Sequence, residues 1–174
     1  PGSLRAYGYG THPDILNSME LERLLASTGP TGGFLEKPSN EEDPQNVLYV
    51  LCDTSALTWN YTARHTVRLA YQDVGDITVL YPEPGAVMGK LDPFWHQKGA
   101  KGVKLVRGVI ESVQPNESNT LHVRYKSAHQ GEKVSQDFDL VVLATGIRPN
   151  VGLSEMARAL EIELSQDGYI KVLE

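Results

Sequence analysis

Two continuous apolar runs stand out in the middle of the chain. Residues 46–51 (NVLYVL) and 76–81 (DITVLY) are apolar at nearly every position, which is typical of strands buried on both faces of a parallel sheet. The segment between them is predicted to be a helix, with apolar residues at helical spacing at Ala63, Val67, Ala70 and Val74. The order strand, helix, strand predicts a βαβ unit with a right-handed crossover.

The apolar pattern continues for one more helix and strand and then changes. Asp92 and Pro93 form a favourable N-cap and N1 pair for a short helix, and residues 103–106 (VKLV) are expected to form a third strand. Short alternating segments separated by turn residues follow at 107–115, 119–127 and 132–139. Such segments are typical of an antiparallel meander. A last apolar strand, 140–144, follows the meander. The expected fold class is therefore α/β, with a parallel sheet, flanking helices and an antiparallel three-stranded β-meander.

The residues before the first apolar run are expected to form a separate segment. Asn17 followed by Glu20 has the form of a capping box and predicts the start of a helix whose apolar stripe is Leu21, Leu24 and Leu25. Residues 27–46 are rich in Gly, Pro, Ser and acidic residues, which indicates an exposed connector. We therefore divide the chain into a linker and helix, 1–45, and an α/β domain, 46–174.

Composition and charge exclude several classes of protein. The 174 residues carry a formal net charge of −6, which argues against nucleic-acid binding because such surfaces concentrate Lys and Arg. No apolar run approaches the ~20 residues that a membrane span needs. The single cysteine fits a reducing compartment, so the cytoplasm is the expected location. Both chain ends look like cuts, and we expect a piece of a larger protein.

The order of elements carries a family resemblance. Parallel strands, a meander, and an apolar strand ending in Ala144, Thr145 and Gly146, with Pro149 and Asn150 downstream, resemble the second nucleotide-binding-type domain of the pyridine nucleotide-disulfide oxidoreductases. The stretch from YGYG at residues 7–10 to Gly33 is similar to one typical of the A subunits of heterodisulfide reductases. There it links the flavin domain to this one. GVKLVRGVIESV and LVVLATGIRPN also resemble that family.

The resemblance implies electron transfer through FAD. In such proteins the Ala-Thr-Gly turn, here Ala144, Thr145 and Gly146, lies against the flavin, where small residues allow close approach of the backbone. The same residues also suit an ordinary strand end and turn. The chain lacks the Gly-x-Gly-x-x-Gly turn that holds FAD, and the family's later Gly-Asp motif would lie beyond Glu174. We therefore expect FAD in the full-length parent and a colourless protein from this chain.

A nicotinamide dinucleotide is the alternative cofactor for the βαβ unit. The turn after residues 46–51 reads CDTSALT, with side chains where close approach of a pyrophosphate needs glycine. Glu83, just past the second strand, could contact a ribose hydroxyl. The polar residues of the turn are also good helix caps: Asp53, Thr54, Ser55 and Thr58.

Cys52 raises the question of an iron-sulfur cluster. In the heterodisulfide reductase A subunits this strand similarly ends in a cysteine, and further cysteines at the start of the next helix hold a 4Fe-4S cluster. Here residues 61–65 (YTARH) stand in their place. Such a cluster needs about four thiolates, so we expect no cluster here and regard Cys52 as a remnant ligand at most. The alternative is a small buried residue at a strand end.

The remaining histidines and aromatic residues suggest no metal site. His65 is expected to be an ordinary surface histidine, and the other histidines show no ligand spacing. Tyr7 and Tyr9 could stack near a flavin or anchor their loop.

Three functions remain open. The first is part of an FAD-dependent electron-transfer subunit of a heterodisulfide reductase-like complex, with iron-sulfur proteins among its partners and a flavin-dependent oxidoreductase as the parent enzyme. The second is an NAD(P)H-dependent pyridine nucleotide-disulfide oxidoreductase domain. The third is a docking or structural module that has lost its redox centres.

Overall fold

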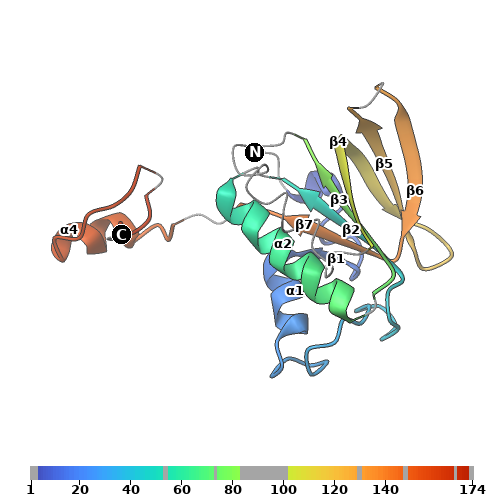
Figure 1. Cartoon of the computed structure of the whole chain (residues 1–174), viewed down its shortest axis with the longest axis horizontal. Coiled ribbons are helices and arrows are strands. Elements are labelled where there is room, and N and C mark those ends of the chain that lie inside the picture. Colours follow the sequence, from blue (N-terminus) through green and yellow to red (C-terminus); the bar gives the residue numbers. More distant parts are fainter. Residues whose placement is uncertain are drawn as a thin grey trace.

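The computed structural model describes residues 4–52, 55–72, 74–82, 102–128, 131–146, 149–166 and 168–172. The strands of this part form one seven-stranded sheet in the order β1-β7-β2-β3-β4-β5-β6 (Figure 1). Their bounds are Ile15–Asn17 (β1), Asn46–Leu51 (β2), Asp76–Tyr81 (β3), Val103–Pro115 (β4), Leu121–Ser127 (β5), Lys133–Phe138 (β6) and Leu140–Ala144 (β7).

The sheet is mixed, as the sequence predicts. Pairing is parallel from β1 through β7, β2 and β3 to the first part of β4, and antiparallel from β4 through β5 to β6. All five residues of β7 and the last five of both β2 and β3 are buried. Continuous apolar runs fit these positions because helices or strands cover both faces of the parallel part. The predicted α/β fold with a β-meander is confirmed.

One strand, β4, replaces two that the sequence predicts. Residues 103–106 and 107–115 belong to one continuous strand, which pairs with β3 up to Arg107 and with β5 from Gly108 onward. A Cβ on Gly108 would lie 2.7 Å from the carbonyl oxygen of Lys126, so only glycine fits where β4 changes partners. The change from a parallel to an antiparallel neighbour therefore occurs within a strand.

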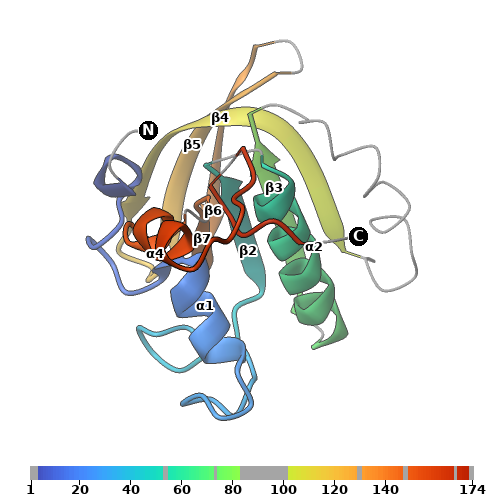
Figure 2. The same ribbon diagram turned by 90° about the vertical axis from the view of Figure 1, so that its left-hand side faces the viewer.

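Two apolar cores lie on opposite faces of the sheet. Helices α1 (Ser18–Leu25) and α2 (Ala56–Tyr71) cover one face, and Figure 2 shows them side by side in front of the strands. The other core contains buried residues of β5 and of the second half of β4, with Tyr7 of the 3₁₀ helix η1 (Leu4–Tyr7) packed against it. The meander therefore folds over the face that the helices leave open.

The segment 1–45 contributes both a strand and a helix to this arrangement. β1 pairs with β7 through all three of its residues, Ile15, Leu16 and Asn17. The sequence pattern did not predict this strand because it is so short. Asn17 then caps α1 in the predicted capping box, accepting hydrogen bonds from the N–H groups of Met19 and Glu20 at 2.9 and 3.0 Å. Leu21 and Leu25 are fully buried.

The buried face of α2 is wider than the predicted stripe. Ala63 is buried, and Ala70 and Val74 pack against the same core, whereas Val67 is only partly buried. Trp59 and Leu69 are fully buried as well, and three threonines also face the interior, which a periodicity of apolar residues does not register. These buried threonines are Thr58, Thr62 and Thr66.

The described C-terminal residues, 149–166 and 168–172, form an arm that extends from the end of β7 (Figure 1). Helix α4 (Leu153–Ala159) is followed by a short turn closed by a bridge between Leu164 and Ile170. Lys171 Nζ lies 2.9 Å from Glu163 Oε2 within the arm. The predicted helix that starts at Asp92 and Pro93 lies outside the described residues.

Candidate functional site

The carboxyl ends of β2 and β7 bring two of the predicted site elements together. Leu51 pairs with Ala144, and the backbone N–H of Cys52 donates to the carbonyl oxygen of Ala144 at 3.0 Å. Because neighbouring parallel strands end at the same sheet edge, Cys52 lies directly beside the Ala-Thr-Gly turn. This edge is where open α/β sheets bind their ligands.

The Ala-Thr-Gly turn offers a small, partly open surface. Ala144 is buried, whereas Thr145 and Gly146 are partly exposed. The N–H of Thr145 donates a hydrogen bond to the carbonyl oxygen of Leu143 at 3.0 Å. The chain therefore leaves the sheet at this point. The small side chains of this turn allow close contact with a planar ring or with a neighbouring domain.

Cys52 is exposed, so the expectation of a buried residue is wrong. The residue follows the last paired residue of β2, and its side chain therefore lies at the sheet edge and not within a covered face. Its Sγ lies 3.7 Å from the carbonyl oxygen of Val50. A cavity of about 90 Å³ lies beside it, lined in part by Tyr7, Cys52 and Pro82. That volume is well below the ~300 Å³ at which small-molecule pockets begin.

Ser55 caps α2, in agreement with the capping role that the sequence allowed for it. Its side chain accepts a hydrogen bond from the N–H of Thr58 at 3.4 Å, and the two hydroxyl oxygens lie 3.0 Å apart. The helix N-terminus is thus occupied by its own cap, which weakens the case for a pyrophosphate there. Glu83, Asp53 and Thr54, the other residues considered for a dinucleotide, lie outside the described residues.

The residues at the expected cluster positions do not fit a 4Fe-4S cluster. Residues 61–65 lie within α2 and contain no cysteine, so Cys52 alone would supply a thiolate. Within the part of the chain that the structure describes, no three His, Cys, Asp or Glu side chains gather as a metal site.

His65 is buried, so the prediction of a surface histidine is wrong. Its side chain is 7% exposed, and Nε2 lies 2.5 Å from Glu22 Oε2 on α1. Burial lowers the pKa of His65 below its ordinary value, against an opposing effect of the Glu22 carboxylate. The sequence pattern missed this because His65 faces α1, and the partner lies 43 residues away.

Tyr49, in the centre of β2, is a second buried polar group near Glu22. Its hydroxyl has no hydrogen-bond partner among the described residues. Burial, with a smaller contribution from the Glu22 carboxylate, raises the pKa of Tyr49 well above 10.0. The phenol therefore stays neutral.

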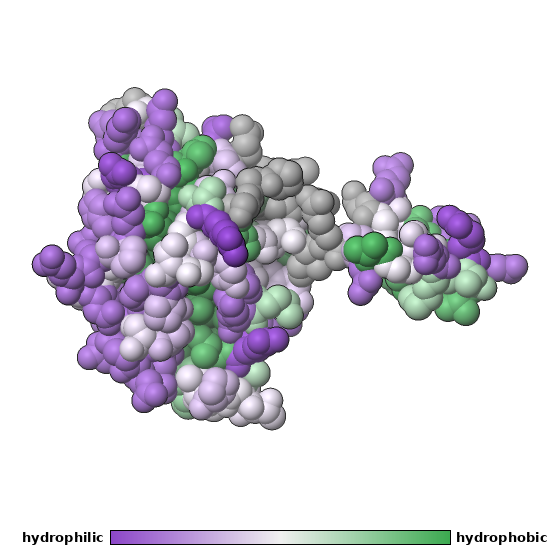
Figure 3. Space-filling model, turned by 180° about the vertical axis from the view of Figure 1, so that it is seen from behind, coloured by the Kyte–Doolittle hydropathy of each residue, from purple (hydrophilic) through white to green (hydrophobic). Residues whose placement is uncertain are grey.

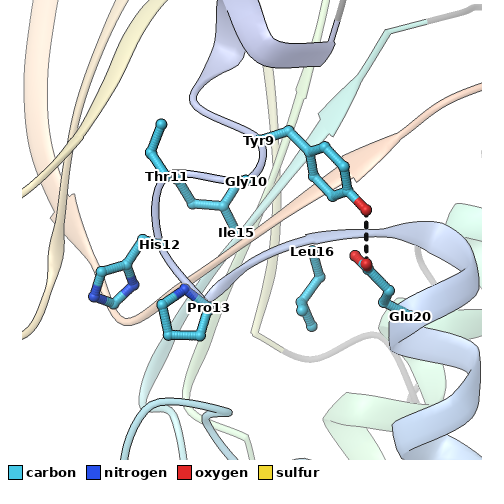
Figure 4. A pocket seen from close by; sticks show the side chains of 8 residues that line it. All are labelled: Tyr9, Gly10, Thr11, His12, Pro13, Ile15, Leu16 and Glu20. Atoms are coloured by element: carbon cyan, nitrogen blue, oxygen red, sulfur yellow. Dashed lines mark hydrogen bonds between the residues drawn. The ribbon is translucent and has the colours of Figure 1, made fainter.

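A second cavity, of about 350 Å³, lies where residues 9–13 pass β1 and α1 (Figure 4). Tyr9 points across it, and its hydroxyl donates to Glu20 Oε1 at 2.6 Å and accepts from Asn17 Nδ2 at 2.8 Å. The hydrogen bond to Glu20, more than its burial, raises the pKa of Tyr9. Tyr9 thus anchors its loop to the start of α1, which is one of the two roles that the sequence suggested.

Known proteins match the chain over nearly its whole length. The iron-sulfur A subunit of a CoB–CoM heterodisulfide reductase from Methanocaldococcus jannaschii is 30% identical over 181 residues, covering 96% of this chain and 28% of the relative. A second protein of this kind, from Methanopyrus kandleri, is 29% identical, covering 97% of this chain and 28% of the relative. The chain's curated relatives are heterodisulfide reductase A subunits. This confirms the resemblance derived from the sequence.

The chain spans only about a quarter of these heterodisulfide reductase subunits. The A subunit of a ferredoxin:CoB–CoM heterodisulfide reductase from Methanosarcina mazei shows a similar proportion, with 27% identity over 95% of this chain and 22% of the relative. No protein-family model matches the chain.

Solved structures show the fold. Lactococcus lactis thioredoxin reductase matches with a TM-score of 0.52 at 14% identity, over 100% of this chain and 49% of the other. The FAD-bound cadaverine monooxygenase of Erwinia amylovora matches with a TM-score of 0.55 at 10% identity, over 100% of this chain and 48% of the other. At such low identity the likeness concerns the fold alone. In the described residues no helix is long and apolar enough to cross a membrane.

Proposed function

We propose that this chain is part of an FAD-dependent electron-transfer subunit of a heterodisulfide reductase-like oxidoreductase complex. The observation that carries this proposal is the match to heterodisulfide reductase A subunits over nearly the whole chain. The position of the Ala-Thr-Gly turn supports it, because Thr145 and Gly146 are partly exposed at the sheet edge where ligands of such folds bind. The parent protein is then a flavin-dependent enzyme of the cytoplasm, with iron-sulfur proteins among its partners.

In this proposal the domain positions the flavin and does not transform substrate. Ala144, Thr145 and Gly146 contact one edge of the FAD, which exchanges electron pairs and single electrons when bound. The domain's own contribution is close packing and exclusion of water at that edge. We assign no acid, base or nucleophile to it, and no iron-sulfur cluster.

The domain arrangement follows from the same proposal. Residues 1–45, which also supply β1 and α1 to the fold, join the flavin domain to the α/β domain 46–174, and the arm packs on that flavin domain. Apolar side chains on the arm support this, since Val151 is 97% exposed and Val172 is 82% exposed. Figure 3 shows hydrophobic residues gathered on the arm as it extends away from the rest of the molecule. Exposed apolar patches of this kind mark contact surfaces.

The flavin content of two proteins tests the proposed function. The full-length parent and the 174-residue chain are purified under the same conditions, and their visible absorbance and iron content are measured. We expect stoichiometric flavin in the parent and none in this chain. A parent without flavin would overturn the proposal and favour the docking module. NADH or NADPH binding to the chain itself would instead favour the second hypothesis.

The turn at the sheet edge is tested in the parent by Gly146→Val. A branched side chain at this position would separate the backbone from the flavin, so we expect the parent to lose at least half of its flavin while its circular dichroism spectrum is unchanged. Ser165→Val, in the exposed turn of the arm, is the control for a comparable substitution away from the sheet edge. Equal flavin content in both variants would show that the turn does not contact the cofactor.

A further inference from the structure

The outer face of β5 carries only basic side chains. Along this strand the residues that point inward are buried, and those that point outward are partly or fully exposed. The inward residues are Leu121, Val123 and Tyr125, and the basic residues that alternate with them are His122, Arg124 and Lys126. The whole chain has a net charge of −6, so a strand with this pattern differs in sign from the protein around it.

The neighbouring strand β6 extends the positive charge at one end. Lys133 is directly opposite Lys126 in the antiparallel register. Like charges in directly opposed positions destabilise a sheet. At the other end of the strands, His122 Nδ1 lies 2.6 Å from Asp137 Oδ1, so an acidic group is placed opposite a basic one there. Charge on this face is therefore concentrated at the Lys126 end.

The three cations at this end have no carboxylate partner in the described part of the chain. Arg124 Nε donates to the hydroxyl oxygen of Ser112 at 3.0 Å, a neutral acceptor. Lys126 and Lys133 form no ion pair with another described residue. Glu132 directly precedes Lys133, and Glu111 lies at the register shift between β4 and β5. We call Arg124, Lys126 and Lys133 the basic face.

An exposed apolar side chain lies next to the basic face. Val109 of β4 is the partner of Lys126 in the sheet register and is 56% exposed. Hydrophilic side chains otherwise cover the side of the molecule on which β5 and β6 lie (Figure 3). An apolar contact with charged groups at its margin is the usual composition of a protein-protein interface.

We propose that the basic face docks a partner protein through a cluster of carboxylates on that partner. The inference deepens the proposed function and rests on it, since it assigns a docking surface within an electron-transfer complex. A partner carboxylate between Lys126 and Lys133 relieves the repulsion between the two ammonium groups, and Val109 contributes apolar contact area. A nucleic acid fits less well, because three cations on a chain of net charge −6 are few for a phosphate backbone.

Poly-L-glutamate serves as the probe for the basic face in the full 174-residue chain. We expect amide chemical-shift changes confined to residues 122–126 and 133–137, lost in about 0.3 M NaCl because exposed charges are screened. Changes centred on other exposed cations, such as Arg23 or Lys104, would overturn the proposal, as would the absence of any change. Tighter binding of a duplex DNA to the same residues would show that the partner is a nucleic acid.

Charge reversal separates binding from folding. Lys126→Glu with Lys133→Glu is expected to weaken poly-L-glutamate binding about tenfold, because opposite charges steer and hold the complex. The control with the same charge change, Arg23→Glu with Lys104→Glu, should alter it less than twofold. The single variant Lys133→Glu should weaken binding while raising the thermal midpoint, because it places opposite charges across the strands. Equal weakening in the test and control pairs would refute a specific face.

The parent complex provides the final test. A zero-length cross-linker couples carboxylates directly to amines. In the parent complex it should join Lys126 or Lys133 to an Asp or Glu of another protein. Coupling only at other lysines would overturn the docking surface. Flavin content of the same preparation is measured separately, so loss of the flavin contradicts the proposed function and loss of coupling contradicts the docking surface.

Discussion

Asp14 shows how a single buried carboxylate organises the N-terminal segment. Its side chain is fully buried just before β1 and accepts hydrogen bonds from Ser39, at 2.9 Å from the backbone N–H and 2.6 Å from the hydroxyl. Asn119, in the turn between β4 and β5, donates to the Ser39 hydroxyl at 3.2 Å. One carboxylate therefore connects three segments that are far apart in the sequence.

Replacing Asp14 should be costly. Asp14→Ala leaves the two Ser39 donors unsatisfied, and we expect the free energy of unfolding to fall by about 2–3 kcal/mol, measured by urea denaturation. Glu163→Ala, which removes an exposed carboxylate from its pair with Lys171, should change it by less than about 0.5 kcal/mol. A small effect at both positions would mean that the hydrogen bonds of Asp14 contribute little.

His65 makes stability depend on pH in a defined direction. Its pKa is lowered in the folded chain, mainly by burial, so the unfolded chain binds more protons as the pH falls below about 6.5. The stabilisation is thus fully present above that pH and is lost as the pH falls toward the folded-state pKa, by at most about 1.4 kcal/mol per pH unit.

The variant His65→Gln should remove this contribution. Urea unfolding at pH 7.5, 6.5 and 5.5 is expected to show a smaller loss of stability on acidification for His65→Gln than for the native chain. His122→Gln is the matched control, because that histidine also pairs with a carboxylate but its side chain is 41% exposed. Identical pH dependence of His65→Gln and the native chain would contradict the assignment.

At the scale of elements, β4 is the strand on which the architecture depends. It pairs with β3 in parallel and then with β5 in antiparallel fashion, and Gly108 is the first residue of the second pairing. The strand thus links the parallel sheet to the meander that covers its other face. Sequence periodicity correctly predicted the two halves separately, because a change of partner leaves no break in the backbone and no hydropathy signal.

Gly108→Ala tests the change of partner. The added methyl group would lie 2.7 Å from the Lys126 carbonyl oxygen and 3.1 Å from Leu80 Cδ1, so backbone and core must move. We expect a loss of about 2–3 kcal/mol in the free energy of unfolding, as overpacked sites show. Gly152→Ala, where the nearest atom is 3.8 Å away, should be nearly neutral in the same measurement. Equal losses in the two variants would show that the effect does not arise from close packing at Gly108.

At the scale of the whole molecule, the arm behaves as a unit of its own. Its described backbone hydrogen bonds outside regular strands, such as Ile162 N to Ala157 O at 2.8 Å and Lys171 N to Glu163 O at 2.9 Å, connect arm residues to one another. The cores on the two faces of the sheet contain no residue of the described arm. Both apolar cores of the sheet are therefore complete without residues of the described arm.

Removal of the arm should leave the rest of the fold intact. A chain ending at Gly146 is expected to unfold with a free energy within about 0.5 kcal/mol of the full chain, and urea denaturation followed by tryptophan fluorescence would measure it. Trp59 is fully buried against the sheet and reports on that core. A loss above about 1 kcal/mol would show that the arm stabilises the domain in solution.

Local sequence signals determined the elements of this protein. Asn17 and Glu20 predicted the start of α1, and the apolar runs predicted β2 and β3, because caps and continuous burial depend on neighbours within a few residues. The quoted family motifs predicted the relatives. The contacts of Ala144, Thr145 and Gly146 with a flavin, and of Glu83 with a ribose, stay predictions.

Tertiary structure decided how those elements meet. Cys52 is exposed because β2 ends beside β7, and His65 is buried because α1 places Glu22 against α2. Lys126 and Lys133 become neighbours only through the β5–β6 register. Each of these facts depends on a partner residue that is distant in sequence or lies on another strand. Hydropathy and spacing along one segment carry no information about such a partner.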